Sequence, residues 1–436
     1  MDSIWSKRAD VPSKPTLDKN INTNVLIIGA GMAGVLCAYK LHKAGVPYAV
    51  VEQDKICSKV TQNTTAKITV GHGFIYDKLI YNFGENKAKM YLEANQFALK
   101  EYIELCKKLP CDFEEKDSFV YSLDNPQKIE KELKALEKLG YDAQFCKSLP
   151  LPFSVAGAVK YSKQAQFNPL KFIAFLAKEL NIYENTKVLE LRPDGAVTTG
   201  GIIKADKIIV ATHFPFINKH GSYFLKQYQH RSYVLALKNA PDLNGMYVDE
   251  NKKGMSFRNF EDLLLIGGGS HRTGKKGGNW QELSEFAKYY YPKAQELCRW
   301  ATQDCMTLDS VSYIGQYSKN TPNLYVATGF NKWGMTSSMV GAELLKDLVM
   351  GKENPYKEVF SPSRSILQPQ LAVNAFEAIT NLLTPSAKRC PHMGCALKWN
   401  KAEHSWDCSC HGSRFSKEGK LLNNPATDDI RKSTDS

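Results

Sequence analysis

A short C-terminal segment concentrates cysteine and histidine at spacings that suit a metal site. The residues are Cys390, His392, Cys395, Cys408, Cys410 and His411. One Cys-x-His pair and one Cys-x-x-His pair offer two thiolates and two imidazoles, which suit either a structural zinc ion or a [2Fe–2S] cluster with mixed ligands. Zinc modules commonly group Cys with Cys and His with His and need no further cysteines, whereas Cys395 and Cys410 remain spare here. This surplus favours the iron–sulfur cluster.

Near the N-terminus, a glycine-rich turn after an apolar stretch predicts a dinucleotide-binding βαβ unit. We expect a strand over 24–29, a helix over 31–44 and a strand over 48–52. Gly29, Gly31 and Gly34 occupy the G-x-G-x-x-G positions, which serve the tight turn, the approach of the pyrophosphate and close helix packing. Glu52 ends the second strand and is expected to accept hydrogen bonds from the adenosine ribose. The other candidates in this unit are Met32, Ala33 and Gln53.

Three features favour FAD over NAD as the dinucleotide. No second G-x-G-x-x-G follows a strand, a predicted strand ends at Thr212, and residues 325–336 combine a strand, a glycine-containing turn and a helix start. The segments VLIIGAGMAG, VVE, QFNP, IIVAT and NLYVATGFNKWGMT resemble the D-amino-acid oxidase, glycine oxidase and sarcosine oxidase (DAO) superfamily over roughly residues 20–350.

The resemblance implies further contacts to the cofactor. In the superfamily the last motif lies against the flavin with a helix N-terminus near its N1/C2-carbonyl edge, where N–H groups stabilise negative charge on the reduced ring. In superfamily members, a segment after the second strand touches the pyrophosphate and the flavin, and residues 64–69 stand at that place here. The implied contacts are Thr65, Lys67, Val188, Thr212, Gly329, Gly334, Met335 and Thr336.

The segment before the last motif departs from the superfamily's pattern. Amino-acid-oxidising relatives often carry an arginine there that clamps the substrate carboxylate, whereas Asp304 resembles that position here. An acidic side chain repels a carboxylate and favours a cationic amine. Arg258 remains a candidate carboxylate contact, and Tyr233 and His271 are further candidates for the substrate pocket.

The C-terminal pattern resembles the Rieske proteins of respiratory and photosynthetic cytochrome complexes. The ligand set that the resemblance implies is Cys390 and Cys408 on one iron and His392 and His411 on the other. It also implies a Cys395–Cys410 disulfide between the two loops, a bond from the Ser413 hydroxyl to a cluster sulfide, and a covering proline loop at 424–426.

Two departures from the Rieske pattern carry expectations. Phe415 stands where the family often has a tyrosine that donates to a ligand thiolate, so we expect a lowered reduction potential. About 50 residues follow Pro385, too few for the family's usual base sheet. The cluster half is therefore expected to lean on the rest of the chain through Leu397, Trp399 and Trp406.

The whole chain resembles fusions of a DAO-type flavoprotein with a C-terminal Rieske domain. The expected fold is an α/β FAD-binding Rossmann-like domain with an α+β substrate subdomain, as in DAO and glutathione-reductase-like folds, plus a small all-β Rieske domain. We expect the oxidoreductase over 20–352, a linker or strap over 353–385 and the Rieske domain over 386–436. The FAD-binding segments are expected at about 20–108, 160–215 and 305–352, and the substrate subdomain at about 109–159 and 216–304.

Composition and charge bear on whether the protein binds nucleic acid, spans a membrane or is secreted. The 436 residues carry a formal net charge of +12 that is spread along the chain, which indicates a solvated basic surface rather than nucleic-acid binding. No apolar run approaches the ~20 residues that span a membrane, and the first residues lack a secretory apolar stretch, so we expect a cytoplasmic protein. The seven other cysteines are expected to be reduced thiols.

A flavin accepts two electrons and releases them singly, whereas a Rieske cluster carries one. Together they predict an FAD-dependent dehydrogenase of CH–NH or CH–NH2 donors that passes electrons from an amine or amino acid to an external one-electron acceptor protein. Two alternatives remain. One is a reductase fed in the opposite direction by a ferredoxin-like donor, and the other is an electron-transfer or redox-sensing module without small-molecule turnover.

Overall fold

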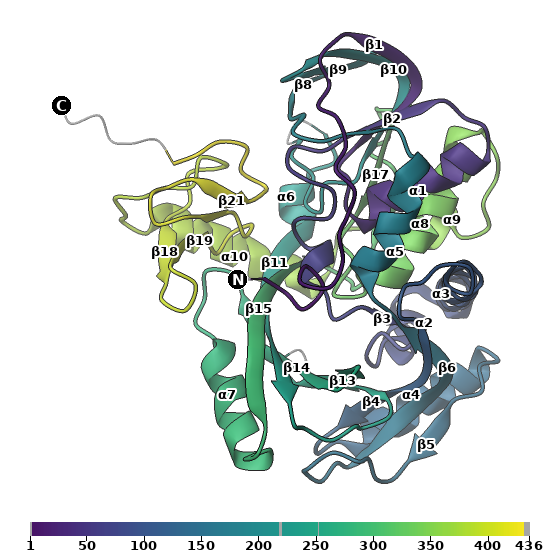
Figure 1. Ribbon diagram of the computed structural model, residues 1–436, viewed down its shortest axis with the longest axis vertical. Helices are drawn as coiled ribbons and strands as arrows, with labels where there is room; N and C mark the ends of the chain where they lie inside the picture. The colour runs from purple at the N-terminus through teal and green to yellow at the C-terminus, as the bar shows by residue number, and fades with distance from the viewer. Residues whose placement is uncertain (1, 218–219, 252, 431–436) are drawn as a thin grey trace.

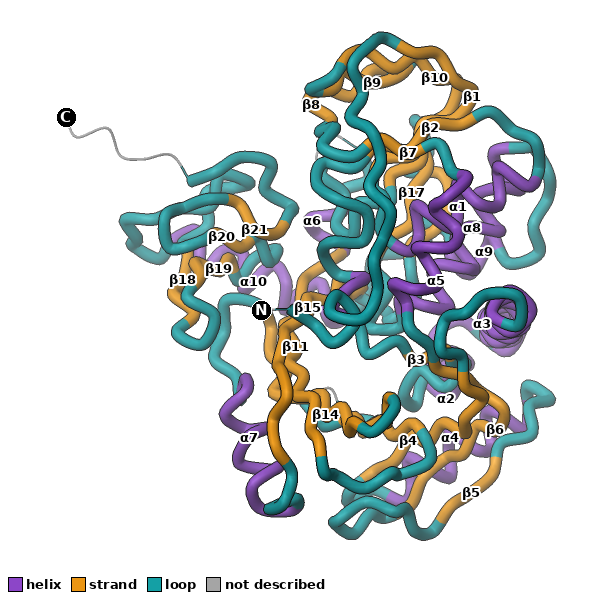
Figure 2. The backbone as a smooth tube through the Cα atoms, in the orientation of Figure 1, coloured by secondary structure: helices purple, strands orange, loops and turns teal. Residues whose placement is uncertain are grey.

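The computed structural model describes residues 2–217, 220–251 and 253–430, and their strands form three β-sheets. In Figure 1 the first sheet and its helices lie at the top, the second sheet at the bottom, and the C-terminal domain projects to the left. Figure 2 shows the loops, in teal, that connect the helices and strands of these parts. The last six residues of the predicted Rieske domain, 431–436, lie outside the described residues.

The first sheet contains the dinucleotide motif and is parallel at its centre. Its main strand order is β16-β17-β10-β1-β2-β7, and β9 and β8 extend it from β10. The bounds are β1 Ile21–Ile28, β2 Tyr48–Val51, β7 Ile182–Tyr183, β8 Val188–Arg192, β9 Gly195–Thr198, β10 Gly201–Val210, β16 Tyr313–Gln316 and β17 Leu324–Thr328. β1 runs parallel to both β2 and β10, so three carboxyl ends share one edge. Open α/β sheets bind ligands at that edge.

The described residues contain ten α-helices. Their bounds are α1 Met32–Lys43, α2 Tyr76–Phe83, α3 Glu85–Cys106, α4 Pro126–Lys138, α5 Pro169–Leu176, α6 Tyr223–Lys226, α7 Asn279–Tyr290, α8 Gly334–Val349, α9 Lys357–Phe360 and α10 Pro369–Leu383. Gly84, which adopts a φ of 80°, separates α2 from α3. Asn168 caps α5 by accepting from the N–H groups of Leu170 and Lys171. No helix among these described residues is long and apolar enough to cross a membrane.

The second sheet has the order β15-β11-β14-β13-β12-β4-β6-β3, with β5 paired to β6. The bounds are β3 Lys67–Ile68, β4 Glu114–Ser122, β5 Gln144–Cys146, β6 Gly157–Gln166, β11 Gln227–Lys238, β12 Met246–Asp249, β13 Ser256–Phe260, β14 Leu263–Arg272 and β15 Gln295–Thr307. The expected segment boundary at about 160 falls inside β6, which pairs with β4 rather than with the first sheet.

The third sheet is a small antiparallel meander at the C-terminus. Its strands are β18 Leu397–Asn400, β19 Ser405–Cys408, β20 Arg414–Phe415 and β21 Leu421–Asn423. The two cysteine- and histidine-bearing loops lie just before β18 and between β19 and β20. The segment 353–385 is more structured than a bare linker, because it contains α9 and α10, and Ala378 of α10 packs against the domain's core.

Candidate active site and metal centre

A cavity of about 750 Å³ lies at the carboxyl edge of the first sheet and reaches the second sheet. Its walls include twelve of the predicted FAD contacts. These are Gly29, Gly31, Met32, Ala33, Glu52, Gln53, Thr65, Lys67, Val188, Thr212, Gly334 and Met335. The volume is in the ordinary range for cofactor and ligand sites.

The N-terminus of α1 is shaped to admit a dinucleotide. Gly29 adopts a φ of 103°, and a Cβ there would lie 2.7 Å from the carbonyl oxygen of Ala211. Glu52 accepts the backbone N–H of Ala30 at 2.9 Å and that of Asp54 at 3.0 Å. Burial raises the pKa of Glu52, and those N–H groups oppose the rise. The glycine cradle therefore fits the FAD that the sequence predicts.

Three predicted FAD contacts do not line the cavity. A Cβ on Gly34 would lie 1.8 Å from the carbonyl oxygen of Gly29, so Gly34 serves the contact between helix and turn. A Cβ on Gly329 would lie 2.3 Å from the side chain of Thr307. The hydroxyl of Thr336 is buried within 3.0 Å of His72 Nε2.

Lys67 brings a positive charge to the cavity. Its ammonium donates to the hydroxyls of Thr65 at 3.1 Å and Ser256 at 3.4 Å. Burial and the nearby charge of Arg258 lower the pKa of Lys67 to about 7. An anionic group in the cavity would counter this destabilisation of the charged form.

The far end of the cavity is lined by Tyr233 and Asp304, two of the substrate-pocket candidates. Burial raises the pKa of Asp304, whereas the charges of Lys332 and Arg231 lower it. Lys332 also lines the cavity and donates to Ser270 Oγ at 3.2 Å. Lys332 was not predicted as a site residue, although it stands within the GFNKWGMT motif that the sequence singles out.

Arg258 and His271 do not line the cavity. The buried guanidinium of Arg258 donates to the carbonyl oxygens of Thr65 at 2.7 Å and Ala66 at 2.9 Å. These bonds hold the Thr65 loop, whereas Nη2 of Arg258 is buried with no hydrogen-bond partner among the residues that the structure describes. His271 Nε2 lies 3.0 Å from the Tyr233 hydroxyl, behind the cavity wall.

In the C-terminal domain, Cys390 and Cys408 lie sulfur to sulfur within hydrogen-bond reach. That bond and the N–H groups of His411, Cys410 and Gly412 lower the pKa of Cys408. The bond with Cys408, together with burial, raises the pKa of Cys390. A set of N–H groups around one thiol is the environment that stabilises a ligating thiolate.

The two histidines face each other from the two loops, with ring centroids 5.0 Å apart and planes at 90°. Burial lowers the pKa of His392 to about 4 and that of His411 to about 3. Both rings are thus neutral, the form that binds metal. Nδ1 of His411 is buried and has no hydrogen-bond partner among the residues that the structure describes. This unpaired nitrogen, on the same pair of loops as the two thiols, fits a mixed thiolate–imidazole site.

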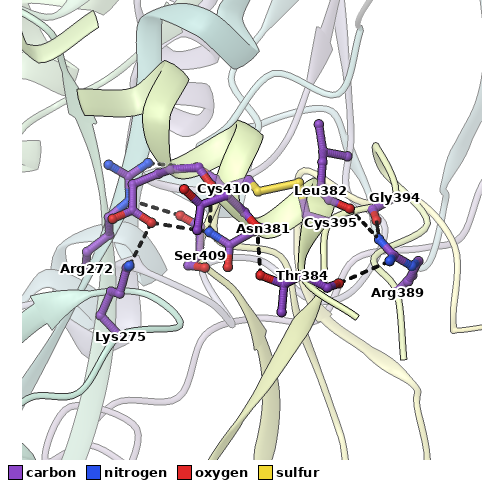
Figure 3. The surroundings of a disulfide bond; sticks show 12 residues. Arg272, Lys275, Asn381, Leu382, Thr384, Arg389, Gly394, Cys395, Ser409 and Cys410 are labelled. Atoms are coloured by element: carbon purple, nitrogen blue, oxygen red, sulfur yellow. Dashed lines mark hydrogen bonds and ion pairs between the residues drawn. A yellow bond between two sulfur atoms is a disulfide. The ribbon is translucent and has the colours of Figure 1, made fainter. Parts of the chain in front are cut away.

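Cys395 and Cys410 form a disulfide, as the Rieske resemblance implies (Figure 3). Both sulfurs lie close to Cys408 Sγ, within a group of atoms spanning 4.8 Å. The disulfide removes two of these three sulfurs from metal binding. Ser413 Oγ accepts the N–H of Ala426 at 3.0 Å, which ties the proline loop to the cysteine loops.

The C-terminal domain leans on the rest of the chain, as expected, but the observed anchors are polar. Gln229 donates to the carbonyl oxygens of His411 and Asn424, both at 2.9 Å. Arg272 donates to the carbonyl oxygens of Ser409 and Cys410, both at 3.0 Å. Leu397 and Trp406, two expected anchors, instead pack into the small core of their own domain. The ring of Trp399, the third, lies 5.1 Å from the ring of Trp406 and is tilted by 56° to it.

A family model described as FAD dependent oxidoreductase (DAO) matches residues 24–348. The chain belongs to the DAO family. A second model, the Rieske [2Fe-2S] domain, matches residues 365–434. The chain is therefore an FAD-dependent oxidoreductase with a C-terminal Rieske [2Fe–2S] domain, and the zinc alternative is set aside. Within the described residues, the glycine cradle of the cavity fits FAD, and the two thiols and two imidazoles of the C-terminal loops fit the [2Fe–2S] cluster.

The chain is also similar to individual proteins. The chain is 36% identical to YhfW of Bacillus subtilis, named as a Rieske 2Fe-2S iron-sulfur protein, over 98% of this chain and 96% of that protein. The cytochrome b6-f complex iron-sulfur subunit of Fritillaria agrestis is 49% identical over 37 residues, 8% of this chain and 16% of that protein.

Solved structures share the fold of the oxidoreductase part. Glycine oxidase from Geobacillus kaustophilus superposes with a TM-score of 0.67 at 20% identity, covering 79% of this chain and 99% of that one. L-proline dehydrogenase from P. horikoshii also gives 0.67, at 18% identity, covering 80% and 98%.

Proposed function

We propose that this chain is an amine or amino-acid dehydrogenase whose electrons leave FAD singly through the Rieske cluster to an external carrier. One observation supports this most directly. The cavity that contains the predicted FAD contacts is also lined by residues of the cluster domain, including Asn424 and Ala426 of the proline loop. The cluster domain thus forms part of the flavoprotein's own cavity wall.

A short chain of side chains joins the two sites. His213 lines the cavity, and its imidazole is within hydrogen-bond reach of the Gln229 side chain. Gln229 in turn donates to the carbonyl oxygen of His411, a proposed cluster ligand. Asn424 donates back to the carbonyl oxygen of Thr212, a proposed FAD contact, at 2.7 Å. These contacts keep the proposed cofactor sites adjacent, which single-electron transfer requires.

In this proposal the roles follow the geometry. FAD, when bound, accepts a substrate's electron pair, and the cluster carries electrons onward one at a time. Gly29, Gly31 and the α1 N-terminus hold the pyrophosphate. Cys390, His392, Cys408 and His411 would hold the cluster, with Cys408 stabilised as thiolate by the surrounding N–H groups.

The substrate class is proposed from the far end of the cavity. Asp304 and Lys332 present opposite charges there, together with the Tyr233 ring. Such a pair complements a substrate that carries an ammonium group, and Lys332 is a cation for a carboxylate in place of Arg258. Related folds belong to glycine oxidase, L-proline dehydrogenase and L-amino acid deaminase, which supports amines or amino acids as the class to test.

The test is anaerobic titration of the protein loaded with both cofactors, using a panel of amines and amino acids. Flavin absorbance and the cluster's EPR signal are followed together. Bleaching of the flavin followed by a reduced-cluster signal supports the proposal and names the substrate class. A silent panel, with both centres reducible by dithionite, contradicts it and favours the reverse reductase or the carrier.

A further inference from the structure

Helix α10 turns a polar face toward the protein and an apolar face toward solvent. Its two buried residues are Asn374 and Asn381, and every residue of this helix lies in the described part of the chain. Phe376 is 69% exposed and Leu383 is 77% exposed. The outward apolar side chains, here named the α10 patch, are Leu367, Val373, Phe376, Ile379, Leu382, Leu383 and Met393. Contiguous exposed apolar surface of this kind marks an interaction site.

The inward polar face accounts for how the helix stays in place. Asn374 Oδ1 accepts from Arg272 Nη1 at 2.9 Å, and the same arginine holds the cluster loop. The carbonyl oxygen of Asn381 accepts the N–H of Ala396 at 2.9 Å, and Ala378 packs against the cluster domain's core. The helix is thus attached by its other side, and the patch is not needed to hold it.

The patch continues onto the loop that carries the first pair of proposed cluster ligands. Met393 follows His392 directly in that loop. The guanidinium of Arg389 donates to the carbonyl oxygens of Leu382 at 3.1 Å and Gly394 at 2.8 Å, which joins the end of α10 to the loop (Figure 3). A protein seated on the patch would therefore lie beside His392.

The charge around the patch is positive. Between residues 365 and 400 the chain has one acidic residue, Glu377, which is paired with Lys275 at 2.7 Å. The cations in the same stretch are Lys388, Arg389 and Lys398, and Arg389 is exposed. α10 itself has no lysine or arginine, unlike helices that lie in a membrane interface with a basic polar face.

We propose that the α10 patch docks an acidic one-electron carrier protein, which exchanges electrons with the Rieske cluster at its His392 edge. This rests on the proposed function, because it assigns the external carrier of that scheme a site. An apolar centre with charges at its edge is the usual anatomy of a protein interface, and redox encounters are at the small end of interface size. The cationic surroundings would steer an acidic partner toward the patch.

The test uses the full chain with both cofactors, reduced by dithionite and freed of excess reductant, so that no substrate is needed. Reoxidation of the cluster is followed by stopped flow with two probes, acidic plant plastocyanin and basic cytochrome c. The variant is Phe376→Ser with Leu383→Ser, and the control is Tyr81→Ser with Tyr289→Ser, two aromatics that are highly exposed on α2 and α7.

The expected result is a second-order rate constant with plastocyanin that falls about tenfold or more in the patch variant and stays unchanged in the control. Arg389→Glu should also lower that rate and weaken its dependence on ionic strength. Equal rates for the patch variant and the parent protein overturn the proposal. Two other results also overturn it. One is a parent protein that dimerises in sedimentation velocity through the patch, so that the patch variant is monomeric, and the other is a parent protein that floats with anionic vesicles while the patch variant does not. Failure of the proposed function shows separately, as a flavin that no amine reduces.

Discussion

Glu403 provides the sharpest test of how the Rieske domain is attached to the oxidoreductase. It lies in the loop between β18 and β19, and its carboxylate is buried between Arg231 of β11 and Arg414 of β20. Arg231 Nε donates to it at 2.7 Å, Arg414 Nη2 at 2.9 Å and the Tyr233 hydroxyl at 3.1 Å. Replacement by glutamine keeps the shape and removes the charge that both guanidinium groups face.

The expected loss can be worked out from the pKa. Burial raises the pKa of Glu403, but the charges and hydrogen bonds of Arg231 and Arg414 more than offset this and lower it from 4.5 to about 2. At ~1.36 kcal/mol per unit of pKa, the charged form is stabilised by about 3 kcal/mol in the folded protein. Because the folded pKa is depressed, this stabilisation is present above pH ~4.5 and is lost as the pH falls toward 2. Removing one partner of a buried ion pair costs about 3–5 kcal/mol in general, a range that includes the value worked out from the pKa of Glu403.

The assay is urea unfolding of the protein loaded with both cofactors at pH 7, followed by visible circular dichroism of the cluster. Glu403→Gln should lower the free energy of unfolding of the cluster domain by about 3 kcal/mol and move its transition to a lower urea concentration. Glu418→Gln, at an exposed turn between β20 and β21, is the matched control and should change the free energy by less than ~0.5 kcal/mol. If Glu403→Gln behaves like that control, the buried arginines do not depend on this carboxylate and the reasoning is refuted.

Three further outcomes are expected. Asp304→Asn should raise the KM of a reactive amine about tenfold or more without loss of FAD, because the anion at the substrate end is gone; an unchanged KM would show that Asp304 does not face the substrate. Phe415→Tyr should raise the midpoint potential of the cluster in an EPR redox titration, since a hydroxyl donor stabilises the reduced cluster, and a potential that stays or falls would be against it. Gly29→Ala should abolish FAD retention on gel filtration, because its Cβ would meet the Ala211 carbonyl oxygen at 2.7 Å. Gly45→Ala, at a φ of 70° with no atom within 4 Å, separates backbone strain from that clash, and equal FAD loss in both variants would contradict the clash.

Local patterns were sufficient to predict the elements that carry the candidate cofactor residues. The glycine spacing at 29–34 lies at a strand-to-helix turn, and the C-terminal cysteines and histidines lie on two facing loops with the expected disulfide. These motifs are short in sequence, and each needs particular residue types because backbone approach and metal ligation leave few substitutes.

Local patterns could not show which long-range contacts the other candidate residues make. Arg258 binds the backbone of the Thr65 loop, Gly329 and Thr336 are not among the residues that line the cavity, and their roles toward substrate and FAD stay predictions. Lys332 stands in the motif that the sequence singled out, but nothing local shows that its side chain meets Asp304. An arginine or lysine has the same composition whether it faces a ligand or a carbonyl oxygen, so only its neighbours distinguish the two.

The sequence by itself determined which cofactors the chain carries, because their donor residues are contiguous or nearly so. Only the tertiary structure decided how the two parts meet. Gln229, Arg272 and Glu403 are distant in sequence and carry no motif, yet they seat the cluster domain against the oxidoreductase part, beside the cavity. Docking of this kind depends on the match of two surfaces, and that match arises only when strands separated by many residues have been brought together.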